Sequence, residues 1–320
     1  MEETIKKLLA DGKGILAADE STHTIEKRFA ALGLASTPEL NKKYREMLFT
    51  TPGIEAYLGG VILFDESVKQ NLQKTLEEKE IIPGIKVDEG LEPFNGGEEQ
   101  ITKGLTGLDV RLKEYLAAGL KFTKWRAAIK ISDIFPSDAF LEEDLNRMTK
   151  FAKISQAAGL VPIVEPEVLL DGNHTTTRCA EISVSVWRIL FEKLKAAGVD
   201  IKNLVLKTNM VLPGKDSGVK GEPLEVAEAT LRSLKESVPP EVGGIVFLSG
   251  GQTPDEATNN LNEIVKRNGE APWPLSFSFS RALQEEAMKV WLGKDENIES
   301  AQEVFLGRLM KVSKARKGEL

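Results

Sequence analysis

Short apolar runs alternate with amphipathic stretches along nearly the whole of this 320-residue sequence. Eight runs have the length and composition of buried strands. They cover residues 14–19, 60–64, 82–88, 123–131, 161–168, 204–211, 244–249 and 275–280. Helical patterns lie between them at 67–80, 108–118, 138–158, 175–197, 222–238 and 255–268. Strand–helix alternation predicts a parallel sheet, and eight strands is the number that closes a (β/α)8 barrel.

A doubly wound sheet gives the same alternation, but it usually has about five or six strands. The residues after the first run, Ala18-Asp19-Glu20-Ser21-Thr22, also lack the glycine-rich fingerprint of dinucleotide-binding folds. We therefore predict an α/β fold made of a single (β/α)8 TIM barrel. We expect one domain over residues 1–320, with a short C-terminal helical tail from about residue 294 and a loop-like insertion at the barrel mouth over 89–107.

Composition excludes several functional classes. The net charge is −7, which does not favour a nucleic-acid partner, although a local cationic pocket for anionic small substrates remains compatible with it. The single cysteine, Cys179, excludes an intrachain disulfide framework and fits a reducing compartment. There is no signal-like leader and no apolar stretch near the roughly 18 residues of a membrane span, so we expect a cytoplasmic protein. The two histidines, His23 and His174, lack ligand-like spacing, so no metal is expected.

Three lysines lie at or near the ends of apolar runs: Lys86, Lys124 and Lys207. An ammonium group is costly to bury, so a lysine in such a place tends to lose its proton more readily. A neutral lysine is a nucleophile toward carbonyl groups. One lysine in such a position would be an anomaly, but three indicate a functional site.

Charged and glycine residues mark the ends of most predicted strands, where barrels carry their active groups. In chain order these are Asp19, Lys86, Lys124 with Arg126, Glu165 with Glu167, Lys207, Ser249-Gly250-Gly251 and Arg281. Converging cations and carboxylates would bind anions and move protons. The alternative is a set of structural salt bridges inside the barrel, but buried pairs rarely stabilise more than a hydrophobic layer would.

Two segments have the features of phosphate sites. Ser249-Gly250-Gly251 follows the seventh predicted strand and Arg281 follows the eighth, which is where barrels commonly bind phosphate. A plain tight turn is the alternative for the glycines. Ser21 and Thr24 could contact a second phosphate, although a helix-capping role is favoured by the residue types alone.

Taken together, five segments resemble class I fructose-bisphosphate aldolases: residues 14–22, 124–126, 162–167, 247–252 and 281–284. The resemblance runs in order from about Lys13 to Gly293. It implies a metal-independent lyase that needs no cofactor. Such an enzyme cleaves fructose 1,6-bisphosphate to dihydroxyacetone phosphate and glyceraldehyde 3-phosphate through a lysine Schiff base. Family members are often tetramers, so a homo-oligomer is expected.

The resemblance also implies residue roles. Lys207 would be the nucleophile, with Lys124 beside it as the charge that tunes it. Glu165 would be the acid and base of carbinolamine dehydration, supported by Glu167, and Asp19 would take the C4 hydroxyl proton. Ser249, Gly250, Gly251 and Arg281 would hold one phosphate, Ser21, Thr24, Lys86 and Arg126 the other, and Lys27 and Arg28 match a basic pair close to the site.

The sequence departs from the family pattern in several places. His23-Thr24 replaces a common Gly-Ser, and Thr208 replaces a proline, which we expect to affect only the local turn. Ser280 replaces a glycine, and its side chain could crowd the approach to phosphate. The C-terminal tyrosine of the animal enzymes has no counterpart, since the last tyrosine is Tyr115; we expect Glu165 to perform its proton exchange more slowly.

Three alternative functions stay open on the residues alone. One is a Schiff-base aldolase or transaldolase for another phosphorylated ketose, but two separate cationic anchors favour a bisphosphate. A second is a metal-dependent aldolase, which the two histidines disfavour. The third is a non-catalytic barrel scaffold, and the presence of Asp19, Lys124, Glu165 and Lys207 argues against it.

Overall fold

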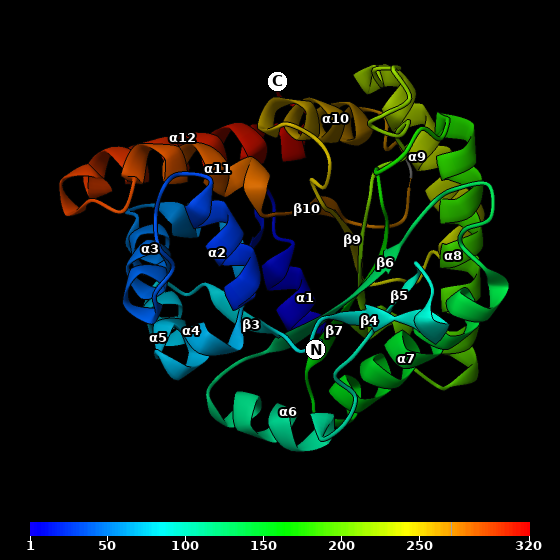
Figure 1. Ribbon diagram of the computed structural model, residues 1–320, viewed down its shortest axis with the longest axis horizontal. Helices are drawn as coiled ribbons and strands as arrows, with labels where there is room; N and C mark the ends of the chain where they lie inside the picture. The colour runs from blue at the N-terminus through cyan, green and yellow to red at the C-terminus, as the bar shows by residue number, and fades with distance from the viewer. Residues whose placement is uncertain (270) are drawn as a thin grey trace.

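Eight parallel strands close into a barrel in the computed structural model, which describes residues 1–269 and 271–320 (Figure 1). The barrel strands are β1 (Gly14–Ala18), β2 (Leu58–Leu63), β3 (Ile82–Lys86), β6 (Phe122–Ile129), β7 (Val161–Val168), β8 (Val205–Thr208), β9 (Gly244–Phe247) and β10 (Leu275–Phe279). They follow one another in chain order, β3 pairs with β6, and β10 pairs with β1 to complete the circle. The predicted (β/α)8 barrel is confirmed, because each predicted strand is present within a few residues.

Helices surround the barrel and cover its outer face (Figure 1). They are α2 (Thr22–Ala30), α3 (Pro38–Thr50), α4 (Asp65–Lys69), α5 (Leu72–Glu78), α6 (Leu108–Ala117), α7 (Asp138–Ala157), α8 (Thr176–Ala196), α9 (Pro223–Ser237), α10 (Pro254–Lys266) and α11 (Arg281–Trp291). Short 3-10 turns lie at η1 (Ile54–Ala56), η2 (Phe94–Gly96), η3 (Ile201–Asn203) and η4 (Asp295–Asn297). The single helix predicted over 67–80 is wrong: the chain breaks between α4 and α5 at Asn71, which adopts a left-handed φ of 61°.

The insertion at 89–107 is more ordered than a loop. It contains an antiparallel hairpin of β4 (Leu91–Pro93) and β5 (Gln100–Thr102), and β5 pairs with β6 through Gln100 and Ala128. Ile101 and Thr102 are buried, and the Thr102 N–H donates to Asp144 of α7 at 3.0 Å. This anchoring to α7 explains why a polar, glycine-rich segment forms strands.

An N-terminal helix, α1 (Glu2–Leu8), closes the end of the barrel where the strands begin. Ile5, Leu8 and Leu9 pack against the inward-facing apolar side chains of the strands, among them Ile15 and Phe122. The helix comes so close to β2 that a Cβ on Gly59 would lie 2.3 Å from the Leu8 carbonyl oxygen. The lower half of the barrel interior is therefore apolar and filled, so open space for a ligand is left at the opposite end.

The C-terminal segment expected from about residue 294 forms η4 and the long helix α12 (Ile298–Lys317). This helix packs along α10 and α11 and buries Phe305, Leu309 and Val312 (Figure 1). The Leu320 N–H donates to Asn262 of α10 at 3.1 Å. The segment is therefore an integral part of the outer helical layer.

Thr208, where a proline was expected from the resemblance, does more than shape a turn. Its buried hydroxyl accepts a hydrogen bond from the Trp187 indole N–H of α8 at 3.0 Å. The residue therefore fixes the end of β8 to the helix that covers it.

In residues 1–269 and 271–320, none of the helices combines the length and the apolar character that crossing a membrane requires.

One buried carboxyl in the fold predicts a pH effect on stability. Asp144 is 1% exposed; Oδ1 accepts the Thr102 N–H, while Oδ2 has no partner among the described residues. Burial raises the pKa of Asp144 from 3.8 to about 6. The folded state thus holds this proton more tightly than the unfolded state. Its stabilising contribution is complete below about pH 4 and is lost as the pH rises through about 6.

The variant Asp144→Asn keeps an oxygen for the Thr102 N–H and cannot ionise. We expect it to raise the free energy of unfolding at pH 8 by roughly 1–3 kcal/mol and to leave it nearly unchanged at pH 4. Urea unfolding at the two pH values measures both quantities. An equal effect at pH 4 and pH 8 would contradict the assignment of this titration to Asp144.

Candidate active site

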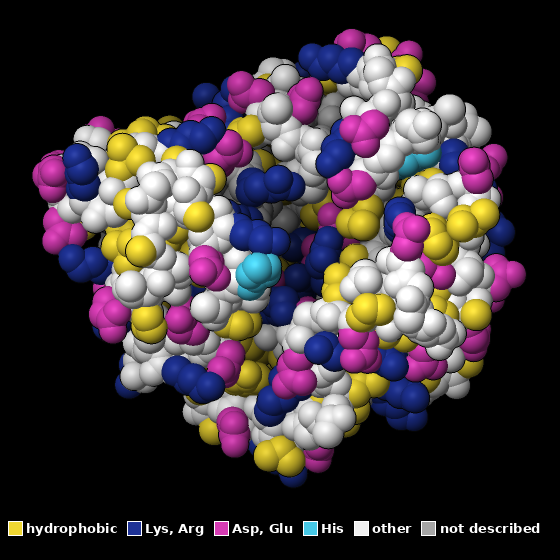
Figure 2. Space-filling view, in the orientation of Figure 1, with side chains coloured by type: hydrophobic (Ala, Val, Ile, Leu, Met, Phe, Trp, Pro, Cys, Tyr) yellow, Lys and Arg dark blue, Asp and Glu magenta, His cyan; other side chains and the backbone are white. Residues whose placement is uncertain are grey.

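A cavity of 460 Å³ opens at the carboxyl ends of the strands, opposite α1. In the space-filling view it is the hollow at the centre of the face, and Lys and Arg side chains gather around it (Figure 2). The sequence-predicted residues that line it are Asp19, Ser21, Thr24, Lys27, Arg28, Lys86, Lys124, Arg126, Glu165, Glu167, Lys207, Ser249, Gly250 and Arg281. The barrel thus brings together residues that are far apart in the chain, such as Asp19 and Arg281.

Gly251 is the exception among the predicted residues. It lines a neighbouring cavity of 350 Å³ instead. Its φ is 75°, and a Cβ at this position would lie 2.7 Å from the Leu170 side chain. Gly250, by contrast, faces the central cavity, where a Cβ would lie 2.7 Å from Glu167 Oε1. Only glycine fits Gly250 without displacing the carboxylate of Glu167.

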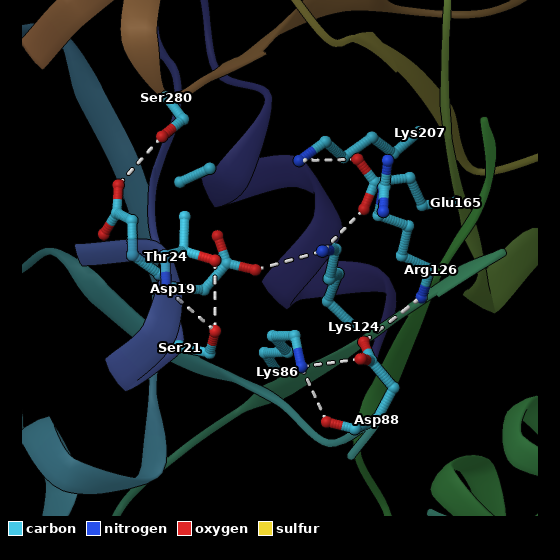
Figure 3. Close-up of polar contacts among 12 residues, drawn as sticks. Asp19, Ser21, Thr24, Lys86, Asp88, Lys124, Arg126, Glu165, Lys207 and Ser280 are labelled. Carbon is cyan, nitrogen blue, oxygen red and sulfur yellow. Dashed lines mark hydrogen bonds and ion pairs between the residues drawn. The ribbon is translucent and has the colours of Figure 1, made fainter. Parts of the chain in front are cut away.

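A line of four alternating charges crosses the floor of the cavity (Figure 3). Glu165 of β7 lies between two lysines: its Oε1 is 3.0 Å from Lys207 Nζ of β8, and its Oε2 is 2.7 Å from Lys124 Nζ of β6. Lys124 also donates to Oδ2 of Asp19, just after β1, at 3.0 Å. The side chains of Lys124, Glu165 and Lys207 are each 4% exposed, so these charges interact with little screening by water.

This arrangement fixes the ionisation of three of the four groups. Burial alone would raise the pKa of Asp19, but the ammonium groups of Lys124 and Lys207 outweigh it and lower the pKa to about 2. Burial likewise opposes ionisation of Glu165, yet Lys124 and Lys207 lower its pKa. The pKa of Lys124 is raised because Asp19 and Glu165 outweigh its burial. At neutral pH both carboxylates and the Lys124 ammonium are therefore charged.

Lys207 differs from Lys124 in its surroundings. Within the described residues its ammonium is paired with one carboxylate, Glu165, whereas that of Lys124 is paired with two. Glu165 is within reach for direct proton transfer at 3.0 Å. Of the two lysines in this line of charges, Lys207 is therefore held by fewer carboxylates, and Glu165 is placed to exchange a proton with its amine.

Two further ion pairs form the wall beside β3 and β6. Lys86 Nζ lies 2.6 Å from Asp88 Oδ1, and it donates to the Asp88 carbonyl at 2.7 Å. The Arg126 guanidinium is paired with Glu167, and this carboxylate is the main cause of its raised pKa. Sequence reasoning missed Asp88, although its spacing of two from Lys86 on an apolar run was a usable signal.

A second group of missed residues lies beside the start of α2. Glu20 is 5% exposed, and its Oε1 accepts hydrogen bonds from Arg28 Nη1 at 2.5 Å, Ser280 Oγ at 2.9 Å and Gln284 Nε2 at 3.1 Å. The hydroxyl of Ser280, which was expected to crowd a phosphate, is therefore bonded to Glu20. Ser21 is the N-cap of α2, as the favoured capping interpretation predicted.

Ser278 is a third residue that the sequence reasoning missed. It lines the cavity, is 1% exposed, and its hydroxyl has no hydrogen-bond partner in the described part of the chain. The pattern Ser276-Phe277-Ser278-Phe279-Ser280 was the available signal, because alternate residues of a strand face the same side. In β10 the serines face inward and the phenylalanines outward toward the helices.

Neither histidine contributes to this cavity. His23 is exposed on α2 near Glu26, and His174 is in a buried position before α8. Across residues 1–269 and 271–320, no group of three or more His, Cys, Asp and Glu side chains is arranged to hold a metal ion.

Comparison with known proteins gives a consistent result. The family model described as "Glycolytic: Fructose-bisphosphate aldolase class-I" matches residues 1–320. "Fructose-bisphosphate aldolase 4, cytosolic" of Arabidopsis thaliana is 44% identical, covering 96% of this chain and 80% of the relative. "Probable fructose-bisphosphate aldolase class 1" of Xanthomonas campestris is also 44% identical, covering 96% of this chain and 94% of the relative.

A solved structure agrees with these relatives. It is the fructose-bisphosphate aldolase from Plasmodium falciparum, in a ternary co-crystal with TRAP and a small molecule inhibitor. The two chains superpose with a TM-score of 0.97 at 42% identity, covering 99% of this chain and 94% of the other. Fold, length and sequence agree over nearly the whole chain, and the chain therefore belongs to the class I fructose-bisphosphate aldolase family, whose members are carbon–carbon lyases.

Proposed function

We propose that this chain reversibly cleaves fructose 1,6-bisphosphate to dihydroxyacetone phosphate and glyceraldehyde 3-phosphate through an imine on Lys207. The observation that carries the proposal is the buried carboxylate of Glu165 between Lys207 and Lys124, at 3.0 Å and 2.7 Å. Imine formation needs a neutral amine with a group beside it that can act as acid and as base. Lys207 would supply the amine, and Glu165 the acid and base.

In the first half of the reaction the Lys207 amine adds to the C2 carbonyl of the open-chain ketose and forms a carbinolamine. Glu165 first takes a proton from the Lys207 ammonium and passes it to the C2 oxygen as the amine attacks. It then takes a second proton from the attacking nitrogen and gives it to the C2 hydroxyl, which leaves as water. The product is a protonated imine. Lys124 remains charged throughout, since its two carboxylate partners hold the proton on it, and it stabilises negative charge that develops on the sugar hydroxyls.

The carbon–carbon bond is broken in the second half. Asp19 takes the C4 hydroxyl proton, the C4 oxygen becomes the aldehyde, and the electrons of the C3–C4 bond move into the protonated imine to give an enamine. Asp19 suits this task because a pKa of about 2 keeps it ionised at neutral pH. Asp19 returns its proton to solvent, and Glu165 takes one up from water and, in our assignment, donates it to the enamine carbon. Hydrolysis of the imine then releases dihydroxyacetone phosphate.

The two phosphates fit the two ends of the cavity. We assign one phosphate to Ser249, Gly250 and Arg281, which line the cavity, whereas Gly251 does not. We assign the other to Ser21, Thr24, Lys86 and Arg126. Glu167 supports the second group by holding Arg126. Lys27 and Arg28 add positive charge at the cavity wall. Cations at both ends favour a bisphosphate over a monophosphorylated ketose.

We also propose that residues 1–320 work as one domain in a cytoplasmic homo-oligomer, and the family resemblance suggests a tetramer. The Arabidopsis relatives carry the description cytosolic, which supports the compartment for this chain. Light scattering coupled to size exclusion measures the oligomeric state directly.

Reduction of the imine with borohydride tests the proposed nucleophile. We expect dihydroxyacetone phosphate plus borohydride to inactivate the protein and to leave a reduced adduct on Lys207, found by peptide mapping. Chelation with EDTA should change neither the trapping nor the activity. The variant Lys207→Met is the matched negative control, with Lys86 and Lys124 still present. An adduct on Lys86 or Lys124, or inhibition by EDTA, would overturn the assignment.

The variant Asp19→Asn separates imine formation from bond cleavage. Because Asp19 acts only after the imine forms, we expect cleavage of fructose 1,6-bisphosphate to fall by roughly 10²–10⁴-fold. Borohydride should still trap the intact six-carbon sugar on Lys207, which mass spectrometry distinguishes from the three-carbon adduct. Thermal unfolding of the variant controls for loss of structure. Cleavage at near the wild-type rate, or complete loss of trapping in a folded variant, would rule out this role for Asp19.

A further inference from the structure

We propose that Ser280 is a positioning residue for substrate phosphate, because its hydroxyl holds the Arg28 guanidinium in place at the cavity wall. The inference rests on the proposed function of the cavity and adds to it a determinant of substrate affinity. Arg28 and Ser280 both line the central cavity, and they come from opposite ends of the chain. Figure 3 shows Ser280 across the cavity from Lys207 and linked to the neighbouring carboxylate.

Three groups form a closed hydrogen-bonded triangle. Arg28 Nη2 donates to Ser280 Oγ at 3.0 Å, and Arg28 Nη1 donates to Glu20 Oε1 at 2.5 Å. The Ser280 hydroxyl in turn donates to the same Glu20 oxygen at 2.9 Å. Ser280 precedes α11 in the N-cap position, yet its side chain makes no capping hydrogen bond to the helix. Its hydroxyl instead bonds to Arg28 and Glu20, and it also accepts a hydrogen bond from Gln284 Nε2 at 3.3 Å.

The triangle is fixed to the core of the protein. The Glu20 carboxylate also accepts a hydrogen bond from Gln284 Nε2 at 3.1 Å, and the same nitrogen donates to the Ala17 carbonyl of β1 at 2.7 Å. The buried Tyr44 hydroxyl donates to Gln284 Oε1 at 3.0 Å. The Glu20 side chain is 3% exposed and that of Arg28 is 20% exposed. Arg28 is therefore held through both terminal nitrogens of its guanidinium, and its partly exposed side chain lines the cavity.

The same contact lies at the seam where the barrel closes. The ladder between β1 and β10 has two registered pairs, and the last is Leu16 with Phe279. Beyond that point the bond between Glu20 and Ser280 continues the connection through side chains. It joins the end of β1, which carries Asp19, to the start of α11, which carries Arg281. The hydroxyl of Ser280 thereby also fixes the spacing of the two segments between which substrate binds.

A fixed guanidinium should change substrate affinity more than the rate of chemistry. An arginine held in its binding geometry loses less side-chain freedom when it binds phosphate. The cleavage groups, by contrast, are positioned by the lysines and carboxylates on the cavity floor, which the Ser280 hydroxyl does not contact. Removal of the hydroxyl should therefore raise KM and leave kcat nearly unchanged.

The test uses Ser280→Ala, which the backbone accommodates because φ at this position is −108°. Initial-rate kinetics with fructose 1,6-bisphosphate should show KM raised by about tenfold and kcat within about twofold of wild type. Ser276→Ala is the matched control, since Ser276 lies on the same strand but donates to the Lys13 carbonyl at 2.7 Å outside the cavity. Ser276→Ala should leave KM unchanged even if thermal unfolding shows lower stability.

A double-mutant cycle shows whether the effect acts through Arg28. In an Arg28→Ala background, Ser280→Ala should have little further effect on KM. An unchanged KM in Ser280→Ala alone, or the same tenfold rise in both backgrounds, would overturn the proposal. If Ser280→Ala does not fold, Ser280→Gly serves instead, because it also removes the hydroxyl and leaves Arg28 and Glu20 in place; it should show the same rise in KM, and an unchanged KM would overturn the proposal.

Calorimetric binding of inorganic phosphate separates this inference from the proposed function. A wild-type protein that does not cleave fructose 1,6-bisphosphate would refute the proposed function. The phosphate measurement would still decide the role of Ser280, because it needs no catalysis. We expect phosphate to bind about tenfold more weakly to Ser280→Ala than to wild type or Ser276→Ala. Equal affinity in all three proteins would refute the role of Ser280.

Discussion

The Glu165 carboxylate between the ammonium groups of Lys124 and Lys207 is the interaction on which the site depends. Three charged side chains that are each 4% exposed would be very costly to bury separately. Together with Asp19 they form a line of alternating charges in which each group stabilises the ionised form of its neighbour. The arrangement also makes the two lysines unequal, because Lys124 has two carboxylate partners and Lys207 has one. We propose that this inequality lets the two lysines perform different tasks.

The barrel makes such a cluster possible by dividing its interior. Side chains that face inward near the start of the strands are apolar and pack on α1, while those with the same orientation nearer the strand ends are charged. On β6, for example, Phe122 belongs to the apolar part and Lys124 to the charged part. The closed, apolar lower half lies beneath the floor of the cavity, and the outer helices cover the apolar side of each strand (Figure 1). Charge is thus concentrated at one end of an otherwise apolar core.

The strands and most cavity residues could be predicted from the sequence because both follow from local patterns. Apolar runs of strand length marked the strands, and charged residues at their ends marked the cavity. The break at Asn71 and the hairpin over 91–102 could not be predicted in this way, since they depend on a left-handed backbone and on the contact with Asp144. Glu20 and Asp88 were missed because their importance comes from partners. The bond from Glu20 to Ser280 joins residues 260 positions apart, which no local pattern shows.

We propose that Glu165 moves the protons that turn the Lys207 amine into an imine. The most direct measurement is the single-turnover rate at which borohydride traps dihydroxyacetone phosphate on Lys207 in Glu165→Gln. Glutamine keeps the size and hydrogen-bonding oxygen of the side chain but cannot transfer the proton. The account predicts trapping at least about 100-fold slower than in wild type, with the affinity for inorganic phosphate changed by less than about threefold. Trapping within about threefold of the wild-type rate would contradict it.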